Sequence, residues 1–482
     1  MLKHMTINEV SILLKKREIS ALELTKIYLE RIEQTEKHVH AFTQIDPQKS
    51  LEDAKIADQM LQKNTCTALT GIPLAVKDII NTVGWKTTCS SKMLENYRSV
   101  YDATCIQKLK AQGMIVIGKT NMDEFAMGSS TETSAFCKTY NPWNLEYVPG
   151  GSSGGSAACV AADQAVCSLG TDTGGSIRQP ASYCSVTGIK PTYGRISRYG
   201  VVSFASSLDQ VGTFTKDARD AALLLEAMCG QDSKDSTSAN RPAPALSQNL
   251  KAGIKGLRIG VPDEYFAKGM DYQVAQIIHD SLKELERQGA ILKDINLPST
   301  KYALAVYYIL APSEASANLA RFDGVKYGLR IEGQDLWEEI EKTRGEGLGD
   351  EVRRRIMIGT YALSAGYYDA WYLKAQKVRT LIKQEFDQAF KEVDVIAAPT
   401  APNLPFKAGA NLDNPLAMYL SDVCTIPVNI AGLPGISLPC GFAAGLPVGL
   451  QIIGRPFDEQ TILNTAYTFQ QVTSYHKERP PL

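Results

Sequence analysis

Two Gly/Ser-rich stretches and one lysine carry the residue types that acyl-transfer chemistry requires. The first stretch is Pro149–Ser156, and the second, Gly170–Arg178, places Ser176 24 residues after Ser152. Upstream, Lys77 stands in an otherwise apolar run, and no histidine lies nearby in the sequence. Hydroxyls, a lysine within a strand and clustered backbone N–H groups predict a serine nucleophile that lysine activates in place of imidazole.

The surroundings of Lys77 decide whether it could act as a base. The run Ile72–Ile80 is typical of a buried strand, and a lysine desolvated there loses part of its preference for charge, so its pKa falls. Neutral lysine is a competent general base. The alternative is a structural lysine whose ammonium reaches solvent from the end of the strand. Lys77 alone leaves both interpretations open.

The second stretch predicts an oxyanion hole. Ala165–Leu169 is an expected strand, Gly170–Gly175 a tight turn, and Ser176 opens the next segment. Glycine accepts positive φ and permits close approach, so successive N–H groups can point into one concavity. The expected donors are the main-chain N–H groups of Thr173, Gly174, Gly175 and Ser176. A plain Gly-rich turn is the alternative.

A nucleotide-binding loop is a rival interpretation. Gly113–Thr120 matches the pattern G-x-x-x-x-G-K-[ST]. The four middle positions should form a loop that wraps phosphates, but here they are Met-Ile-Val-Ile, which favour a buried strand. A phosphate loop follows its strand, whereas this pattern contains one, so the context argues against nucleotide binding.

An α/β-hydrolase is a second rival. Gly150–Gly154 fits G-x-S-x-G, a motif that needs a strand directly before it. The preceding residues 141–147 resemble a loop. The downstream histidines are also poor partners, because His279 is expected within a helix and His476 in a polar tail. We expect surface roles for both.

Bulk composition excludes several classes of protein. The 482 residues include 51 basic and 52 acidic side chains, a balance that does not suggest a chain that coats nucleic acid by itself. The ten cysteines lack disulfide-like or zinc-like spacing. No apolar run approaches the roughly 20 residues of a membrane span, and Met1–Thr6 lacks a signal core. We expect a soluble, cytoplasmic protein without a metal site.

Alternating strands and helices predict the fold class. Apolar runs expected as strands are Ile72–Val76, Met114–Ile117, Ala165–Leu169, Leu257–Val261, Ile291–Ile295, Val393–Ala398, Ile436–Pro439 and Val448–Ile453. Thr6–Glu9 and Ser20–Glu23 fit capping boxes of two N-terminal helices, and apolar residues at helical spacing from Val274 to Leu285 predict another that Gly289 closes. The order predicts an α/β protein with a mixed, mainly parallel central sheet covered by helices on both faces.

One large domain over residues 1–482 is expected. Its parts would be an N-terminal helical segment (1–65), a core carrying the chemistry (70–230), a Pro/Ser-rich surface connection (231–256) and the remainder of the sandwich (257–482), with a charged excursion near 326–351.

Taken together, these residues resemble the amidase signature family. The block Gly150–Ala158 followed by Gly170–Pro180 is similar to its defining stretch, and the resemblance extends over roughly residues 5–480. It implies a catalytic triad of lysine, a serine in a cis peptide and a nucleophilic serine, which fall on Lys77, Ser152 and Ser176. The implied oxyanion donors fall on the backbone of residues 173–176.

Within the family, the chain is similar to the A-type subunits of tRNA-dependent amidotransferases. The stretches that carry this are Gly118–Glu132, Ser206–Gln210, Ala311–Ser316 and Met418–Asp422. The resemblance implies a glutaminase whose ammonia amidates misacylated Glu-tRNA(Gln), Asp-tRNA(Asn) or both in a complex with B-type and C-type subunits. No cofactor is implied for glutamine hydrolysis, whereas ATP and Mg²⁺ would act through the partner. A free-standing amidase for small amides is the alternative.

The resemblance also implies contacts to glutamine. A carboxylate-binding arginine falls on Arg355, an ammonium-binding acid on Asp422, and a tyrosine near the amide on Tyr307, with Tyr308 a close competitor. Met127, Gly128 and Ser129 are expected beside the site as substrate contacts or part of an ammonia gate.

Overall fold

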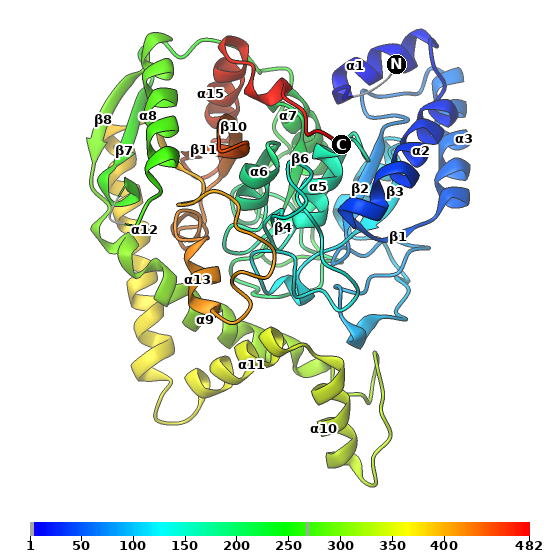
Figure 1. Cartoon of the computed structure of the whole chain (residues 1–482), viewed down its shortest axis with the longest axis vertical. Coiled ribbons are helices and arrows are strands. Elements are labelled where there is room, and N and C mark those ends of the chain that lie inside the picture. The colour runs from blue at the N-terminus through cyan, green and yellow to red at the C-terminus, as the bar shows by residue number, and fades with distance from the viewer. Residues whose placement is uncertain (1–3, 267–268) are drawn as a thin grey trace.

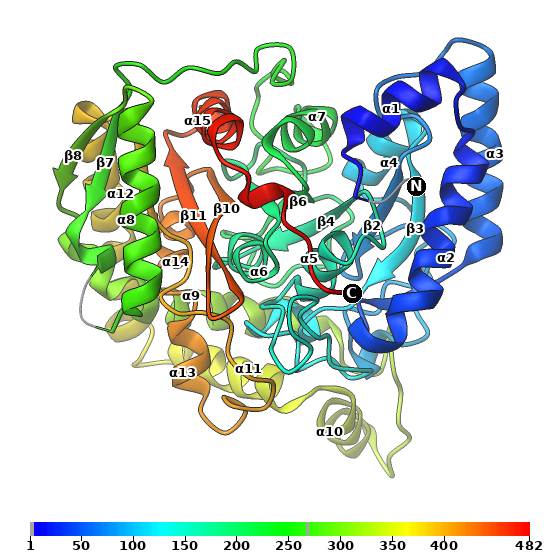
Figure 2. The same cartoon turned by 45° about the horizontal axis from the view of Figure 1, so that its top comes forward.

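One large sheet runs through the molecule (Figures 1 and 2). The computed structural model describes residues 4–266 and 269–482, so residues 1–3 and 267–268 of the expected single domain lie outside it. Within the described residues the sheet has eleven strands. In spatial order these are β1 (Phe42–Ile45), β3 (Ile115–Thr120), β2 (Pro73–Lys77), β4 (Cys167–Asp172), β6 (Gln210–Thr215), β5 (Thr187–Lys190), β10 (Gly435–Ala443), β11 (Leu446–Gly454), β9 (Val395–Pro399), β7 (Arg258–Pro262) and β8 (Ile291–Ile295).

Helices flank this sheet and confirm the expected α/β class. They are α1 (Ile7–Lys16), α2 (Ala21–Val39), α3 (Pro47–Gln62), α4 (Thr104–Ala111), α5 (Gly154–Ala161), α6 (Arg178–Cys184), α7 (Ala218–Met228), α8 (Tyr272–Arg287), α9 (Ala303–Asn318), α10 (Leu336–Gly347), α11 (Asp350–Leu363), α12 (Lys374–Glu392), α13 (Pro415–Leu420), α14 (Ile426–Ile430) and α15 (Glu459–Val472). Figure 2 shows α5 and α6 over the centre, α2 and α3 at one end and α8 at the other.

The expected predominance of parallel pairs needs correction. Among the described strands, β2–β3, β2–β4, β7–β8 and β7–β9 are parallel, whereas the other six neighbouring pairs are antiparallel. One reason is the connection of β10 to β11 through only Ala444 and Gly445, since so short a link forces antiparallel pairing. A second reason is that the hydrophobic pattern did not reveal strands β1, β5 and β6, and these strands pair antiparallel with their neighbours.

Both N-terminal capping boxes form as predicted. The Thr6 hydroxyl accepts the Glu9 N–H at 3.2 Å, and the Glu9 carboxylate accepts the Thr6 N–H at 2.8 Å. Ser20 and Glu23 make the same reciprocal pair at the start of α2. Each box satisfies backbone donors that the first helical turn leaves free.

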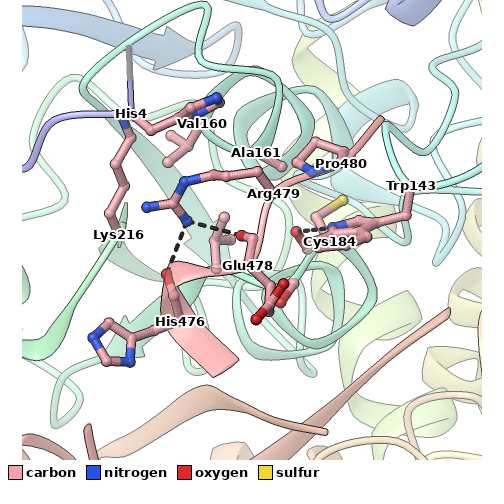
Figure 3. Close-up of a pocket in the computed structure, with 12 residues that line it drawn as sticks. His4, Trp143, Val160, Ala161, Cys184, Lys216, His476, Glu478, Arg479 and Pro480 are labelled. Atoms are coloured by element: carbon pink, nitrogen blue, oxygen red, sulfur yellow. Dashed lines mark hydrogen bonds between the residues drawn. The ribbon is translucent and has the colours of Figure 1, made fainter. Parts of the chain in front are cut away.

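His4, the first described residue, lies near the C-terminal segment. The His4 main-chain N–H donates to Asp163 Oδ2 at 2.7 Å, and Lys216 Nζ donates to the other carboxylate oxygen at 2.5 Å. Figure 3 shows His4 and Lys216 around one small pocket with His476, Glu478, Arg479 and Pro480 of the C-terminal segment. The Asp163 carboxylate therefore ties the segment before α1 to the turn that follows α5.

The two expected surface segments differ in form. Residues 231–256, all of them described, connect α7 to β7 without helix or strand. Residues 326–351 include α10, which stands away from the body in Figure 1. No helix of the described residues is long and apolar enough to cross a membrane.

The central parallel strands position the chemistry. β2 lies between β3 and β4, with Leu74 opposite Cys167 and Val76 opposite Leu169. The carboxyl ends of β2 and β4 therefore meet at one edge, where open α/β sheets commonly bind ligands. The phosphate-loop pattern is a buried strand, as expected, because its residues from Ile115 to Thr120 form β3.

Candidate active site

The Lys77 amine lies at the centre of a cluster of hydroxyl groups. Its Nζ is 2.7 Å from Ser152 Oγ, 2.7 Å from Ser153 Oγ and 2.9 Å from Thr171 Oγ1. Lys77 ends β2, Thr171 lies near the end of β4, and the two serines precede α5. The Ser153 hydroxyl donates to the Thr171 carbonyl at 3.1 Å. Ser153 is therefore an acceptor towards Lys77, and the lone pair of a neutral amine is left for another hydroxyl.

Burial prepares Lys77 to act as a base. The side chain is completely buried, and desolvation lowers its pKa to about 7 although Asp123, Asp172 and Asp209 oppose the shift. A base is most effective when its pKa lies near the working pH. The ammonium of Lys77 does not reach solvent, so the snorkelling alternative is excluded.

The turn after β4 is closed by its own ion pair. Asp172 precedes it and Arg178 follows it, with a buried N–O distance of 3.0 Å. Asp172 also accepts the main-chain N–H groups of Ile177 and Arg178. In contrast, the N–H groups of residues 173–176 donate to no other described part of the chain. They are free to bind a developing oxyanion.

Two glycines in this turn are required by close approach. A Cβ on Gly174 would lie 2.8 Å from the Tyr307 ring, and one on Gly175 would overlap the Thr425 hydroxyl. Gly175 also has φ +144°, which L side chains rarely adopt. The Thr425 hydroxyl donates to the Gly174 carbonyl at 2.7 Å. The turn is thus held from outside by α9 and by the segment before α14.

The two predicted catalytic serines occupy different positions. Ser152 is fully buried beside Lys77 and follows a cis peptide bond from Gly151. Ser176, at the end of the turn, keeps 8% of its surface exposed. No hydrogen bond joins Ser152 to Ser176 within residues 4–266 and 269–482. Lys77 and Ser152 are therefore brought together, and Ser176 is the more exposed of the two serines.

Arg355 is a buried cation with an unused donor. It is 2% exposed, unlike the neighbouring Arg353. Its Nε donates to Glu351 at 2.8 Å, and its guanidinium lies 5.1 Å and 5.3 Å from the ring centroids of Tyr308 and Tyr419. Nη2 is buried without a partner among the described residues. Such an atom calls for an explanation, and a ligand carboxylate supplies one.

Asp422 presents the complementary feature. One carboxylate oxygen accepts the Ser129 hydroxyl at 2.5 Å, and the other is buried without a described partner. That free Oδ1 lies 3.2 Å from the position of a Cβ on Gly175, so it adjoins the turn. Desolvation raises the pKa of Asp422 to about 7 despite the Ser129 hydrogen bond. A ligand ammonium would offset the desolvation of the Asp422 carboxylate.

The tyrosines and the 127–129 segment fall around this site. Tyr307 touches Gly174, whereas Tyr308 stacks on Tyr419 beside Arg355, so Tyr307 is the one next to the turn. Met127 is completely buried. Gly128 leaves room for the Asp123 carboxylate, which a Cβ would overlap.

The histidines predicted to be uninvolved lie elsewhere. His279 on α8 stacks on Phe266 with ring centroids 4.7 Å apart. His476 lines the pocket in Figure 3, which none of the Lys77 cluster lines. The loop before Ser152 also lacks the strand that a nucleophile elbow requires, within the residues that the structure describes. These placements argue against a Ser–His hydrolase centred on Ser152.

Comparison with known proteins identifies the family. A family model described as Amidase matches residues 23–463. The chain belongs to the amidase family. It is 59% identical over 480 residues to the A-type subunit of glutamyl-tRNA(Gln) amidotransferase from Dehalococcoides mccartyi, with 99% of each chain covered. It is 57% identical over 482 residues to the corresponding A-type subunit from Roseiflexus sp., covering 100% of this chain and 99% of the relative.

Solved structures agree. The crystal structure of the A-type subunit of glutamyl-tRNA(Gln) amidotransferase from Thermotoga maritima has 43% sequence identity and a TM-score of 0.83, covering 100% of this chain and 98% of that one. A peptide amidase bound to chymostatin has 27% identity and a TM-score of 0.84 over 99% of both chains. The Lys77, Ser152 and Ser176 arrangement therefore lies in an amidase scaffold, whose members typically use Ser–Ser–Lys chemistry.

Several residues of this amidase site were not predicted. Ser153 is one of them, because nothing in the local sequence indicates that both adjacent serines contact Lys77. Thr171 was assigned to the turn because the expected strand ended at Leu169, whereas β4 continues to Asp172. Asp123 accepts main-chain N–H groups of the 130–133 segment, a tertiary role without a local signal.

The protonation of Lys77 predicts the pH dependence of hydrolysis. Below pH 7 the amine is charged and accepts no proton, so kcat/KM should rise with pH and level off above about 7. Arginine stays charged at these pH values, so Lys77→Arg should lose about 10²–10⁴-fold in kcat. Lys216→Arg, at a similarly buried lysine paired with Asp163, is the control. An ascending limb near pH 10, or near-normal turnover of Lys77→Arg, would refute this role.

Proposed function

We propose that this protein is the glutamine-hydrolysing subunit of a tRNA-dependent amidotransferase. The observation that carries the proposal is the buried Lys77 amine against Ser152, together with two buried charged side chains, Arg355 and Asp422, each of which keeps one polar atom without a described partner. This arrangement suits an amide whose other end is a zwitterion. The relatives that are A-type subunits of glutamyl-tRNA(Gln) amidotransferase, matched over almost their whole length, support it.

The proposed reaction begins with proton transfer. Neutral Lys77 accepts a proton from Ser152, which accepts one from Ser176, and Ser176 Oγ attacks the side-chain amide of glutamine. Main-chain N–H groups of residues 173–176 stabilise the oxyanion. The relay returns the proton to the leaving nitrogen, which departs as ammonia, and water then hydrolyses the acyl-enzyme to glutamate.

The same proposal assigns the ends of glutamine. The free Nη2 of Arg355 binds the α-carboxylate, and the free Oδ1 of Asp422 binds the α-ammonium. Tyr307 packs against the turn near the amide, and Ser129 holds the second oxygen of Asp422. Met127 and Gly128 belong to the segment that leads to Ser129 and are proposed as its support or as part of an ammonia gate.

Ammonia produced here needs an acceptor. We propose that B-type and C-type partner subunits dock on this chain, and that the B-type partner uses ATP and Mg²⁺ to amidate misacylated Glu-tRNA(Gln) or Asp-tRNA(Asn). Exposed apolar side chains on and after α11 support docking, among them Met357, Tyr361, Tyr368 and Trp371. The ten free cysteines support action in the cytoplasm, a reducing compartment.

Removal of the Ser176 hydroxyl should abolish hydrolysis without unfolding the protein, because the hydroxyl lies on a turn that other contacts hold. We expect Ser176→Ala to lose about 10³-fold or more in kcat. Acid quenching during glutamine turnover should leave an ester on the wild type, detected by mass spectrometry, and none on the variant. An ester on Ser176→Ala would show that another residue is the nucleophile.

Arg355→Ala and Asp422→Ala should reduce the use of glutamine more than they reduce the reactivity of Ser176. Each loses a hydrogen bond to a charged group, typically about 1.5–3 kcal/mol, so kcat/KM for glutamine should fall about 10- to 150-fold. Acylation by 4-nitrophenyl acetate, which lacks both charges, should stay within about threefold of wild type. Arg353→Ala, on the exposed side of α11, is the control. Normal glutamine use by both variants would show that other residues bind the charged groups of glutamine.

Partner dependence separates an amidotransferase subunit from a free-standing amidase. The isolated chain should release ammonia from glutamine slowly, and B-type and C-type subunits with misacylated tRNA should raise the rate. The measurement is ammonia release by the chain alone and in the complex. Equal rates, together with hydrolysis of diverse small amides by the chain alone, would favour the free-standing amidase.

A further inference from the structure

The proposed reaction leaves one buried carboxylate without a role. Glu124 begins the short helix η2 (Glu124–Ala126), directly before Met127, and is 2% exposed. One of its oxygens accepts the hydroxyl of Ser91, and the other accepts the main-chain N–H of Gly349 at 2.8 Å. Glu124 and Gly349 are 225 positions apart in the sequence. The carboxylate therefore joins two distant segments of the chain.

The partner of Glu124 is the start of α11. Gly349 is the N-cap residue of that helix, and no side chain of its own caps the first turn. Free N–H groups and the helix dipole at this end favour a carboxylate. The glycine has φ −70°, so it is not required by backbone conformation, but a Cβ there would overlap the Glu124 carboxylate. Close approach of Glu124 explains the glycine.

The contact between Glu124 and Gly349 connects the segments that carry or contact the two proposed glutamine-binding residues, Arg355 and Asp422. α11 carries Arg355 on the second turn after the cap. The main-chain carbonyl of Glu124 accepts the Met127 N–H at 2.9 Å, in the segment that leads to Ser129 and so to Asp422. Glu124 thus contacts both elements that set the spacing between Arg355 and Asp422.

Burying Glu124 has an energetic cost that its contacts offset. Desolvation raises the pKa of its carboxyl to about 7, while the hydrogen bonds of Ser91 and Gly349 and the charges of Lys92 and Arg353 oppose the shift. A buried carboxyl that lost these two donors would be left unsatisfied. The bond to Gly349 is therefore retained in the folded state, and it fixes where α11 begins.

We propose that Glu124 is a positioning residue that caps α11 from the core and thereby sets the guanidinium of Arg355 at the carboxylate end of glutamine. This rests on the proposed function, because it assumes that Arg355 binds the α-carboxylate. The same residue, through the 127–129 segment, keeps Asp422 in register with Arg355. Glu124 touches neither substrate nor the reacting atoms.

The first test compares the loss of a carboxylate contact at the start of two helices. Glu124→Ala removes the cap of α11, and Asp335→Ala removes the side-chain cap that the neighbouring α10 receives from Asp335. We expect Glu124→Ala to raise KM for glutamine about tenfold or more, with kcat and acylation by 4-nitrophenyl acetate within about threefold of wild type. Asp335→Ala should change neither. The side chain of Glu124→Gln can still accept the Gly349 N–H, so KM of this variant for glutamine should stay within about threefold of wild type.

The second test reaches the same contact from the other side. Gly349→Ala in the wild type should displace the Glu124 carboxylate and raise KM for glutamine by a similar factor. In the Glu124→Ala background the added methyl group meets no carboxylate, so Gly349→Ala should have little further effect. This non-additivity is the expected signature of a direct contact.

The outcomes distinguish this inference from the proposed function. If Arg355→Ala impairs glutamine use but Glu124→Ala behaves like Asp335→Ala, Glu124 has no positioning role. The same conclusion follows if Glu124→Ala slows acylation by 4-nitrophenyl acetate as much as glutamine turnover, or if the two substitutions are additive. If the wild type does not use glutamine, or Arg355→Ala uses it normally, the proposed function itself fails.

Discussion

The desolvation of one amine is the constraint on which the rest of the site depends. Lys77 is useful as a base only while neutral, and a carboxylate in contact with it would restore the ammonium. The three acids around it are engaged elsewhere: Asp172 with Arg178, Asp209 with the Thr173 hydroxyl, and Asp123 with main-chain N–H groups. Hydroxyl groups occupy the contact positions instead. Central strands suit this arrangement because water is excluded from both sides of the sheet.

The Asp172–Arg178 pair gives the turn its rigidity. Arg178 is fully buried and also donates to Gln451 at 2.6 Å and to the Thr425 carbonyl at 3.1 Å. Desolvation alone would raise the pKa of Asp172, but Arg178 outweighs it and brings the pKa to about 2. Loss of one partner of such a pair leaves an uncompensated charge, which typically costs about 3–5 kcal/mol. The turn is therefore fixed before a substrate arrives, as transition-state stabilisation requires.

Sequence reasoning succeeded where the signal was local. The apolar run around Lys77 predicted a buried strand, Thr6 and Ser20 predicted helix starts, and the phosphate-loop pattern was correctly rejected from its strand-like middle. It failed where pairing partners decide the outcome. Gln210–Thr215 is rich in small and polar residues, yet it is a buried strand because both of its neighbours pair with it. Arg355 and Asp422 came from family resemblance, and the contact of Glu124 with Gly349 has no local signature.

The site is divided between two kinds of structural element, one that carries the proposed base and one that carries the proposed glutamine contacts. Lys77 and Thr171 belong to strands, whereas Arg355 and Asp422 belong to a helix and a helix-flanking turn. Nη2 of Arg355 and Oδ1 of Asp422 are both buried and have no partner among the described residues. A zwitterion supplies a partner for each of these two atoms, but an amide that lacks either charge leaves one of them without a partner. Discrimination of this kind exceeds what a hydrophobic pocket provides, so selectivity for glutamine would originate in Arg355 and Asp422 and not in the strands that carry Lys77 and Thr171.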